Sequence, residues 1–170
     1  MLVDLCCGSK KRPGALGVDH VALPGIDVVH ILNQTPWPLA DASATDILCE
    51  HGIEHVENVV DFMAECHRIL KPGGVLRIVT PHFTSANSYG DPTHVRHLSA
   101  YWFRTFTKGG YLAPTTGEFS LVSTEVKFGK SLRAKIGEWI VRLRGLEKWE
   151  KTSAFRYPGM DVQTALRCEK

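Results

Sequence analysis

Apolar and polar positions follow their most regular pattern in the middle of the chain. The apolar segment Asp46 to Cys49 predicts a buried strand, and a polar loop follows it. Apolar residues then recur at helical spacing from Val59 to Leu70, which predicts an amphipathic helix. Lys71-Pro72-Gly73-Gly74 ends that helix, because Pro and Gly do not continue one. Val75 to Val79 predicts a second buried strand. A strand–helix–strand unit implies parallel strands, and we therefore expect an α/β sheet.

The flanking pattern predicts further strands over 2–6, 16–19, 27–32, 119–128 and 161–168, helices over 98–106 and 131–149, and a loop over 82–97. This order of elements favours a doubly wound, mostly parallel sheet with an antiparallel edge strand. The connection from Gly8 to Val18 is too short for a helical crossover, so we expect a loop or a single turn there.

Length and composition favour one soluble domain. The 170 residues have ordinary apolar and charged fractions, and no apolar run approaches the ~18 residues that span a bilayer. The first residues lack a basic leader, so we expect a cytoplasmic location. Five irregularly spaced cysteines argue against a disulfide framework, and we expect Cys49, Cys66 and Cys168 in the core.

Positive charge is concentrated late in the chain. Residues 127–156 contain nine Lys or Arg and three Glu, a surplus of six positive charges, although the whole chain carries only +2. We therefore expect a single domain over 1–170 with a basic amphipathic helical insertion at about 130–150.

Five segments carry a resemblance, in this order: LVDLCCG (2–8), GVD (17–19), PWPLADASATDIL (36–48), EHGIEHV (50–56) and HRILKPGGVLRIVTPH (67–82). Together they resemble the class I S-adenosylmethionine-dependent methyltransferases. The likeness is greatest to a small subgroup whose first strand and glycine loop lead quickly into a second strand. The resemblance implies a Rossmann-like fold, S-adenosylmethionine as cofactor, and methyl transfer to a small-molecule or sugar-containing acceptor.

The resemblance also implies a cofactor site, whose residues are Asp4, Cys6, Gly8, Asp19, Asn33 and Glu50. Asp4 would lie near the amino group of the cofactor, Asp19 would accept from the two ribose hydroxyls, and Asn33 would lie near the adenine. Cys6 and Lys10 replace glycines of the family's loop, and a cysteine at positive φ is strained. Alternatively, Cys6 and Gly8 only shape a tight strand exit, Asp19 is a solvated loop acid, and Asn33 is a turn residue.

Histidines are the candidates for a general base, which a hydroxyl or amine acceptor requires. Our order of preference is His94, His82 and then His51, and His97 is a further candidate. His94 lies in a loop in which Asp91 is expected to form an Asx turn before Pro92. Each of these histidines alone is equally consistent with a hydrogen-bonding or surface role. We expect no metal.

Residues 51–55 also fit the inverted zinc-protease signature H-x-x-E-H. In that alternative His51 and His55 bind zinc and Glu54 acts as general base. Two histidines four residues apart share a face only in a helix, and Gly52 weakens one. A catalytic site would need a third ligand as well.

The second alternative is a non-catalytic module that binds the cofactor, an anionic membrane surface or nucleic acid through the helix at 131–149. Its basic residues are Lys130, Arg133, Lys135, Arg142, Arg144 and Lys148. Its apolar stripe is Leu132, Ile136, Trp139, Ile140, Leu143 and Leu146. We favour docking of the stripe onto the domain, with the basic residues solvated.

Overall fold

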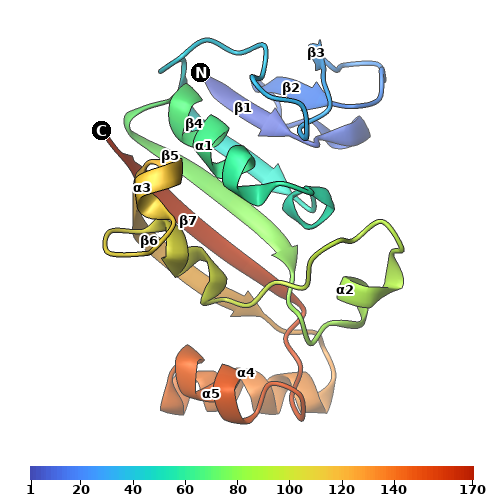
Figure 1. Cartoon of the computed structure of the whole chain (residues 1–170). Helices are drawn as coiled ribbons and strands as arrows, with labels where there is room; N and C mark the ends of the chain where they lie inside the picture. The colour runs from blue at the N-terminus through green and yellow to red at the C-terminus, as the bar shows by residue number, and fades with distance from the viewer.

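A computed structural model describes all residues, 1–170, and places seven strands in one sheet of order β3-β2-β1-β4-β5-β7-β6 (Figure 1). The strands are β1 (Leu2–Leu5), β2 (Leu16–Asp19), β3 (Val28–Val29), β4 (Ala44–Glu50), β5 (Leu70–Pro81), β6 (Glu118–Lys127) and β7 (Asp161–Glu169). β1 to β5 pair in parallel, and β7 pairs antiparallel with both β5 and β6. The expected mostly parallel sheet with antiparallel pairing at one edge is confirmed.

The helices are α1 (Val59–Ile69), α2 (Ala86–Gly90), α3 (Ala113–Thr116), α4 (Leu132–Arg144) and α5 (Leu146–Thr152). Three 3-10 turns cover Gly8–Lys10, Ile53–His55 and Trp102–Phe106. The first of them is the single turn expected between β1 and β2. The sequence pattern missed α2 and α3, and it predicted one helix where α4 and α5 are separate. The helix expected over 98–106 is wrong, since only the 3-10 turn Trp102–Phe106 forms there. Gly145 ends α4 with a φ of +82°, a left-handed conformation that only glycine adopts easily.

Asn58 caps the amino end of α1. Its side-chain oxygen accepts from the backbone N–H groups of Val60 and Asp61. At the other end α1 passes directly into β5 at Leu70. This tight connection fixes the position of α1 between β4 and β5, and β4 and β5 contribute to the edge of the sheet at which the parallel strands end.

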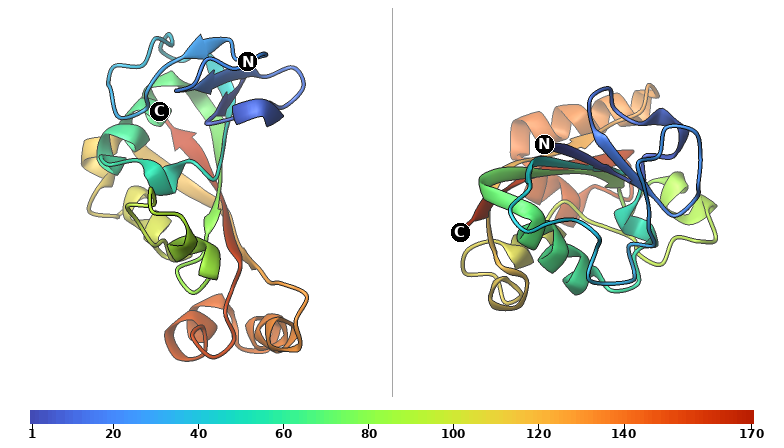
Figure 2. Two further views of the ribbon diagram at one scale, coloured as in Figure 1. Left: turned by 90° about the vertical axis from the view of Figure 1, so that its right-hand side faces the viewer. Right: turned by 90° about the horizontal axis from the view of Figure 1, so that it is seen from above.

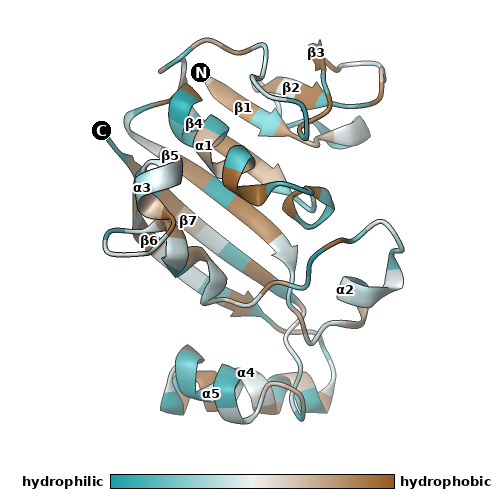
Figure 3. Cartoon of the chain, in the orientation of Figure 1, coloured by the Kyte–Doolittle hydropathy of each residue, from teal (hydrophilic) through white to brown (hydrophobic).

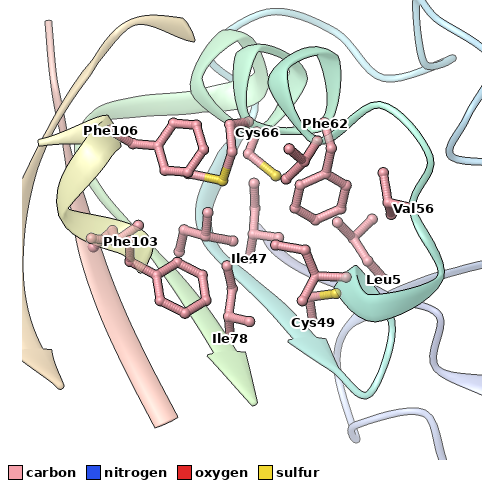
Figure 4. Close-up of a cluster of buried hydrophobic side chains, with 14 of the residues drawn as sticks. Leu5, Ile47, Cys49, Val56, Phe62, Cys66, Ile78, Phe103 and Phe106 are labelled. Atoms are coloured by element: carbon pink, nitrogen blue, oxygen red, sulfur yellow. The ribbon is translucent and has the colours of Figure 1, made fainter. Parts of the chain in front are cut away.

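The hydrophobic core lies between the sheet and α1, and Figure 4 shows its centre. Phe62 and Cys66 of α1 face Ile47 and Cys49 of β4 (Figure 4). Cys49, Cys66 and Cys168 are fully buried, as expected. Figure 3, which is coloured by hydropathy, shows polar and apolar positions that alternate along strands of the sheet.

No helix lies in the short connections that join β1, β2 and β3, so the opposite face of the sheet is largely uncovered (Figure 2). This face carries polar side chains from Glu50, Arg77, Glu125 and Gln163, which line a shallow cavity of about 360 Å³ together with Arg12. The side chains on this face of the sheet remain in contact with solvent, whereas those on the face covered by α1 form the core.

α4 and α5 connect β6 to β7 and project beyond the end of the sheet at which β5 ends (Figures 1 and 2). α4 docks through its small residues Ala134 and Gly137, since a Cβ on Gly137 would lie 2.7 Å from the Phe128 ring. The expected docking of the apolar stripe is therefore wrong in part: side chains that point to solvent are Leu132 (74% exposed), Trp139 (61%) and Leu143 (61%). None of the helices combines the length and apolar character that crossing a bilayer requires.

Candidate functional site

The carboxyl ends of the parallel strands meet at one rim, and the strand order reverses at β1. Ligands of open α/β sheets bind at such a switch point. The loop after β1 contains two left-handed residues, Cys6 (φ +55°) and Gly8 (φ +51°). The strained conformation expected for Cys6 is therefore present. A Cβ on Gly8 would have no atom within 4 Å, so the loop leaves room beside its backbone.

Asp19 ends β2 beside this loop, and its side chain is only 8% exposed. One carboxylate oxygen accepts from the Gly8 N–H at 2.9 Å, and the other accepts from the Val21 N–H at 3.0 Å. Nδ1 of His20 also lies 3.2 Å from Oδ1, so only about one of the roughly four lone-pair positions of the carboxylate is left. The structure thus brings Gly8 and Asp19 together, and Asp19 is more than a solvated loop acid.

Asp4 and Glu50 face Arg12, which the sequence pattern did not indicate as a site residue. The Arg12 backbone N–H donates to Asp4 at 2.7 Å, and the Arg12 guanidinium pairs with Glu50 at 2.7 Å. Burial and the nearby Glu50 charge raise the pKa of Asp4, although the Arg12 N–H opposes this shift. The turn at 8–10 therefore folds the following residues back over both carboxylates.

Asn33 lies on the same rim beyond β3, and its side-chain oxygen accepts from the Glu57 N–H at 2.9 Å. This bond joins the segment after β3 to the loop after β4. Glycine backbone with free space, a buried carboxylate, and an amide in the segment after β3 fit a nucleoside such as the adenosyl group of S-adenosylmethionine. In this arrangement Gly8, Asp19 and Asn33 would hold it, whereas Asp4 and Glu50 are occupied by Arg12.

His82 is fully buried at the end of β5, and both of its ring nitrogens have partners. Nδ1 contacts the Thr84 hydroxyl at 2.7 Å, and Nε2 contacts the Glu150 carboxylate at 2.9 Å. Glu150 also accepts from the Ala100 N–H at 2.7 Å. The ring therefore links β5 to α5, and it has no free nitrogen with which to accept a proton from a substrate.

His51 follows β4 on the rim, with half of its side chain exposed. Its Nδ1 lies 3.4 Å from Oε1 of Glu54, and this carboxylate raises the pKa of His51. Burial raises the pKa of the neighbouring Asp161, which begins β7. His51 is thus an accessible imidazole between two acidic side chains, and Asp161 is a neighbour that the sequence pattern did not reveal.

His94 lies in the loop after α2, where the expected Asx turn forms: Asp91 accepts from the Thr93 N–H at 2.8 Å. The loop places the His94 ring 4.6 Å from the His55 ring. His97 instead stacks on Tyr89 at a centroid distance of 3.9 Å. His94 therefore joins the rim on the side of His55, and His97 does not.

Ligand atoms of Glu54, His55 and His94 lie within 4.8 Å of one another. In the inverted zinc-protease alternative, the zinc ligands were expected to be His51 and His55, with Glu54 as the general base. The 3-10 turn begins only at Ile53, so His51 and His55 do not share a helical face. Folding of a remote loop onto the turn brings in His94 instead, a contact that spacing within the sequence does not reveal.

Comparison with known proteins supports the sequence resemblance. A family profile described as a methyltransferase domain matches residues 4–78. A curated protein of Mycolicibacterium smegmatis, named a probable S-adenosylmethionine-dependent methyltransferase, is 36% identical in an alignment of 108 residues that covers 57% of this chain and 42% of that protein. The chain thus spans about two fifths of the length of this relative.

Solved structures of S-adenosylmethionine-dependent methyltransferases share the fold. One from Archaeoglobus fulgidus superposes with a TM-score of 0.62 at 17% identity, covering 98% of this chain and 85% of the other. Another from Mesorhizobium loti has a TM-score of 0.58 at 15% identity, with coverages of 98% and 89%. Residues 4–78 are thus similar to a methyltransferase domain, part of the chain is similar to a probable S-adenosylmethionine-dependent methyltransferase, and the whole chain has the fold of the solved methyltransferases.

Proposed function

We propose that the chain binds S-adenosylmethionine at the rim formed by Gly8 and Asp19 and catalyses methyl transfer to a small-molecule or sugar-containing acceptor. The observation that carries the proposal is the pairing of a left-handed loop after β1 with a buried acid after β2 at the switch point of the sheet. The match to a methyltransferase domain covers both elements. The bound cofactor supplies a methyl group on a cationic sulfur, which is already activated for displacement.

The chain's own contribution is alignment and removal of a proton. Methyl transfer is an in-line displacement, so the acceptor must be held in a fixed orientation against the methyl carbon. His51 is the proposed general base, because its Nδ1 faces Glu54 and its Nε2 is free on the rim. Glu54 orients the ring and stabilises the imidazolium that forms. His82 is excluded from this role by its buried contacts, and His94 lies further along the rim.

Calorimetric titration with S-adenosylmethionine tests the cofactor site. We expect Asp19→Ala to weaken binding tenfold or more, since hydrogen bonds to a charged group contribute ~1.5–3 kcal/mol. Asp27→Ala is the matched control, because Asp27 also accepts a backbone N–H, from Gly17, but its side-chain partner is Lys11 and it makes no hydrogen bond to Gly8. Unchanged affinity in Asp19→Ala, or equal weakening in both variants, would contradict the proposed site.

A second candidate function is contact with an anionic membrane surface through α4. The exposed Leu132, Trp139 and Leu143 form an apolar ridge on α4, which also carries the basic residues Arg133, Lys135, Arg142 and Arg144. Lys130 precedes the helix, and Lys148 lies on α5. An apolar ridge with a basic border matches the interface of anionic lipid, into which apolar side chains insert while lysines and arginines meet the headgroups. The surplus of positive charge in residues 127–156 favours an anionic membrane over a neutral membrane or a protein surface without acidic residues.

Sedimentation with vesicles tests this candidate. We expect binding to phosphatidylglycerol vesicles that weakens with salt, little binding to phosphatidylcholine vesicles, and loss of binding in Trp139→Ser. Tyr111→Ser is the control, since Tyr111 is also exposed but lies outside the insertion. Equal binding to both vesicle types, or none to either, would reject membrane contact. Salt-sensitive binding to DNA without vesicle binding would point to nucleic acid instead.

A further inference from the structure

Glu54, which the proposed function pairs with His51, has one feature that this pairing does not fully explain. Its side chain is only 1% exposed. Oε2 accepts from the Thr80 hydroxyl at 2.9 Å, but Oε1 is buried without a hydrogen-bond partner. His51 Nδ1 is 3.4 Å from Oε1, a distance of ionic contact without an aligned hydrogen bond. A buried carboxylate oxygen without a partner is costly, so Glu54 points to a cation that completes its environment.

The two neighbouring histidines have the orientation that metal ligands adopt. His55 Nδ1 contacts the Thr93 hydroxyl at 3.0 Å, and Thr93 in turn donates to Asp91 at 2.6 Å. His94 Nδ1 contacts the Ser88 carbonyl at 3.1 Å. A metal-bound histidine usually has its second nitrogen fixed by a carbonyl or a carboxylate-linked group in this way. The Nε2 atoms of both rings are left without partners.

We infer that Glu54, His55 and His94 form a divalent metal site, with a carboxylate oxygen and two imidazole Nε2 atoms as ligands. Two imidazoles and one carboxylate suit zinc, which accepts the same set in known proteins together with a fourth ligand. The inference uses none of the residues of the proposed cofactor site, although it shares Glu54 with the proposed His51 pair. It differs from the H-x-x-E-H arrangement because His94 replaces His51.

Closure of the site requires a small movement. One candidate ligand atom from each of the three side chains lies within 4.8 Å of the other two, whereas atoms bound to one zinc ion at ~2.0–2.1 Å lie ~3.3 Å apart in tetrahedral geometry. The loop that carries His94 is exposed from Gly90 to Thr93, so it can approach the 3-10 turn without disrupting the core. Metal binding is therefore expected to order this loop over the rim.

Zinc titration of the chelator-treated protein, with a chromophoric chelator as competitor and without S-adenosylmethionine, tests the site. We expect one zinc ion per chain and a zinc-dependent rise in the melting temperature of the wild-type protein. His94→Gln and His55→Gln should each weaken zinc binding by at least 100-fold. His97→Gln is the matched control, since His97 shares the loop and its Nδ1 contacts Ser88, but it is outside the cluster. Its affinity should equal that of the wild type.

The inference is overturned if the cooperatively folded wild type binds no stoichiometric zinc, if His94→Gln binds as tightly as the wild type, or if His97→Gln loses affinity equally. His94 is partly exposed, so His94→Gln is expected to fold even if a change at the buried Glu54 does not. Because the titration uses the metal alone, its failure leaves the cofactor site untouched, and failure of cofactor binding leaves the metal result intact.

Discussion

Glu150 is the residue whose removal most directly tests the buried connection between α5 and the sheet. The backbone N–H of Thr84 lies 3.2 Å from Nδ1 of His82 and donates to it, so the ring proton of the neutral imidazole is on Nε2 and is donated to Glu150. Glu150 accepts a second hydrogen bond from Ala100, and its side chain is only 6% exposed. Glu150→Ala removes the acceptor of both bonds and leaves two buried donors unpaired.

Each lost hydrogen bond to the carboxylate is worth ~1.5–3 kcal/mol, so we expect Glu150→Ala to lower the free energy of unfolding by ~3–6 kcal/mol. A domain of this kind typically has ~5–15 kcal/mol in total, so the loss is large. Urea unfolding followed by circular dichroism measures it. Glu150→Gln retains one acceptor oxygen and should lie between the wild type and Glu150→Ala.

Glu147→Ala is the matched control on the same helix, because Glu147 is exposed and pairs at the surface with Lys151. We expect little change in its unfolding midpoint. The reasoning is refuted if Glu150→Ala stays within ~1 kcal/mol of the wild type, or if the two alanine variants lose stability equally.

Two further predictions concern docking of α4 and the acids near β1 and β2. Gly137→Val places a side chain against Phe128, so we expect a loss of ~1–3 kcal/mol and faster tryptic cleavage within 130–157; cleavage at the wild-type rate would refute close packing. Burial raises the pKa of Asp4, so the contribution of Asp4 to stability falls as the pH rises through that pKa. The hydrogen bond from Lys11 lowers the pKa of Asp27, so the contribution of Asp27 is lost as the pH falls through its pKa. Carboxyl NMR titration should give a higher midpoint for Asp4 than for Asp27, and the reverse order would contradict both assignments.

Local patterns predicted those parts of the fold that depend on neighbours in the sequence. The helical spacing from Val59 placed α1 to within a residue, whereas β5 begins at Leu70, before the predicted start at Val75, and includes Lys71-Pro72-Gly73-Gly74. Alternation in 119–128 and 161–168 predicted β6 and β7. The segments that resemble methyltransferases also anticipated that Gly8 and Asp19 lie together on the rim. These features are local because each depends on the periodicity or turn chemistry of a short segment.

The contacts of individual side chains depended on tertiary packing. The residues around Arg12 in the sequence do not indicate that its backbone N–H donates to Asp4 and its guanidinium pairs with Glu50. Both contacts depend on the turn between β1 and β2, which folds Arg12 back toward these carboxylates. Similarly, the apolar stripe of α4 predicted a helix that docks through that stripe. The structure instead packs the helix face that contains Gly137 against Phe128. Helical spacing shows which residues share a face, whereas the shape of the opposing surface decides which face is buried.

The sequence by itself therefore determined the parallel sheet, the order of its elements and the family that it resembles, since these follow from patterns repeated over many residues. Only the tertiary structure decided that His82 is sealed against Glu150 and that His94 meets Glu54 and His55. Such contacts join segments up to 68 residues apart, and their energies depend on burial and geometry that a linear pattern does not encode.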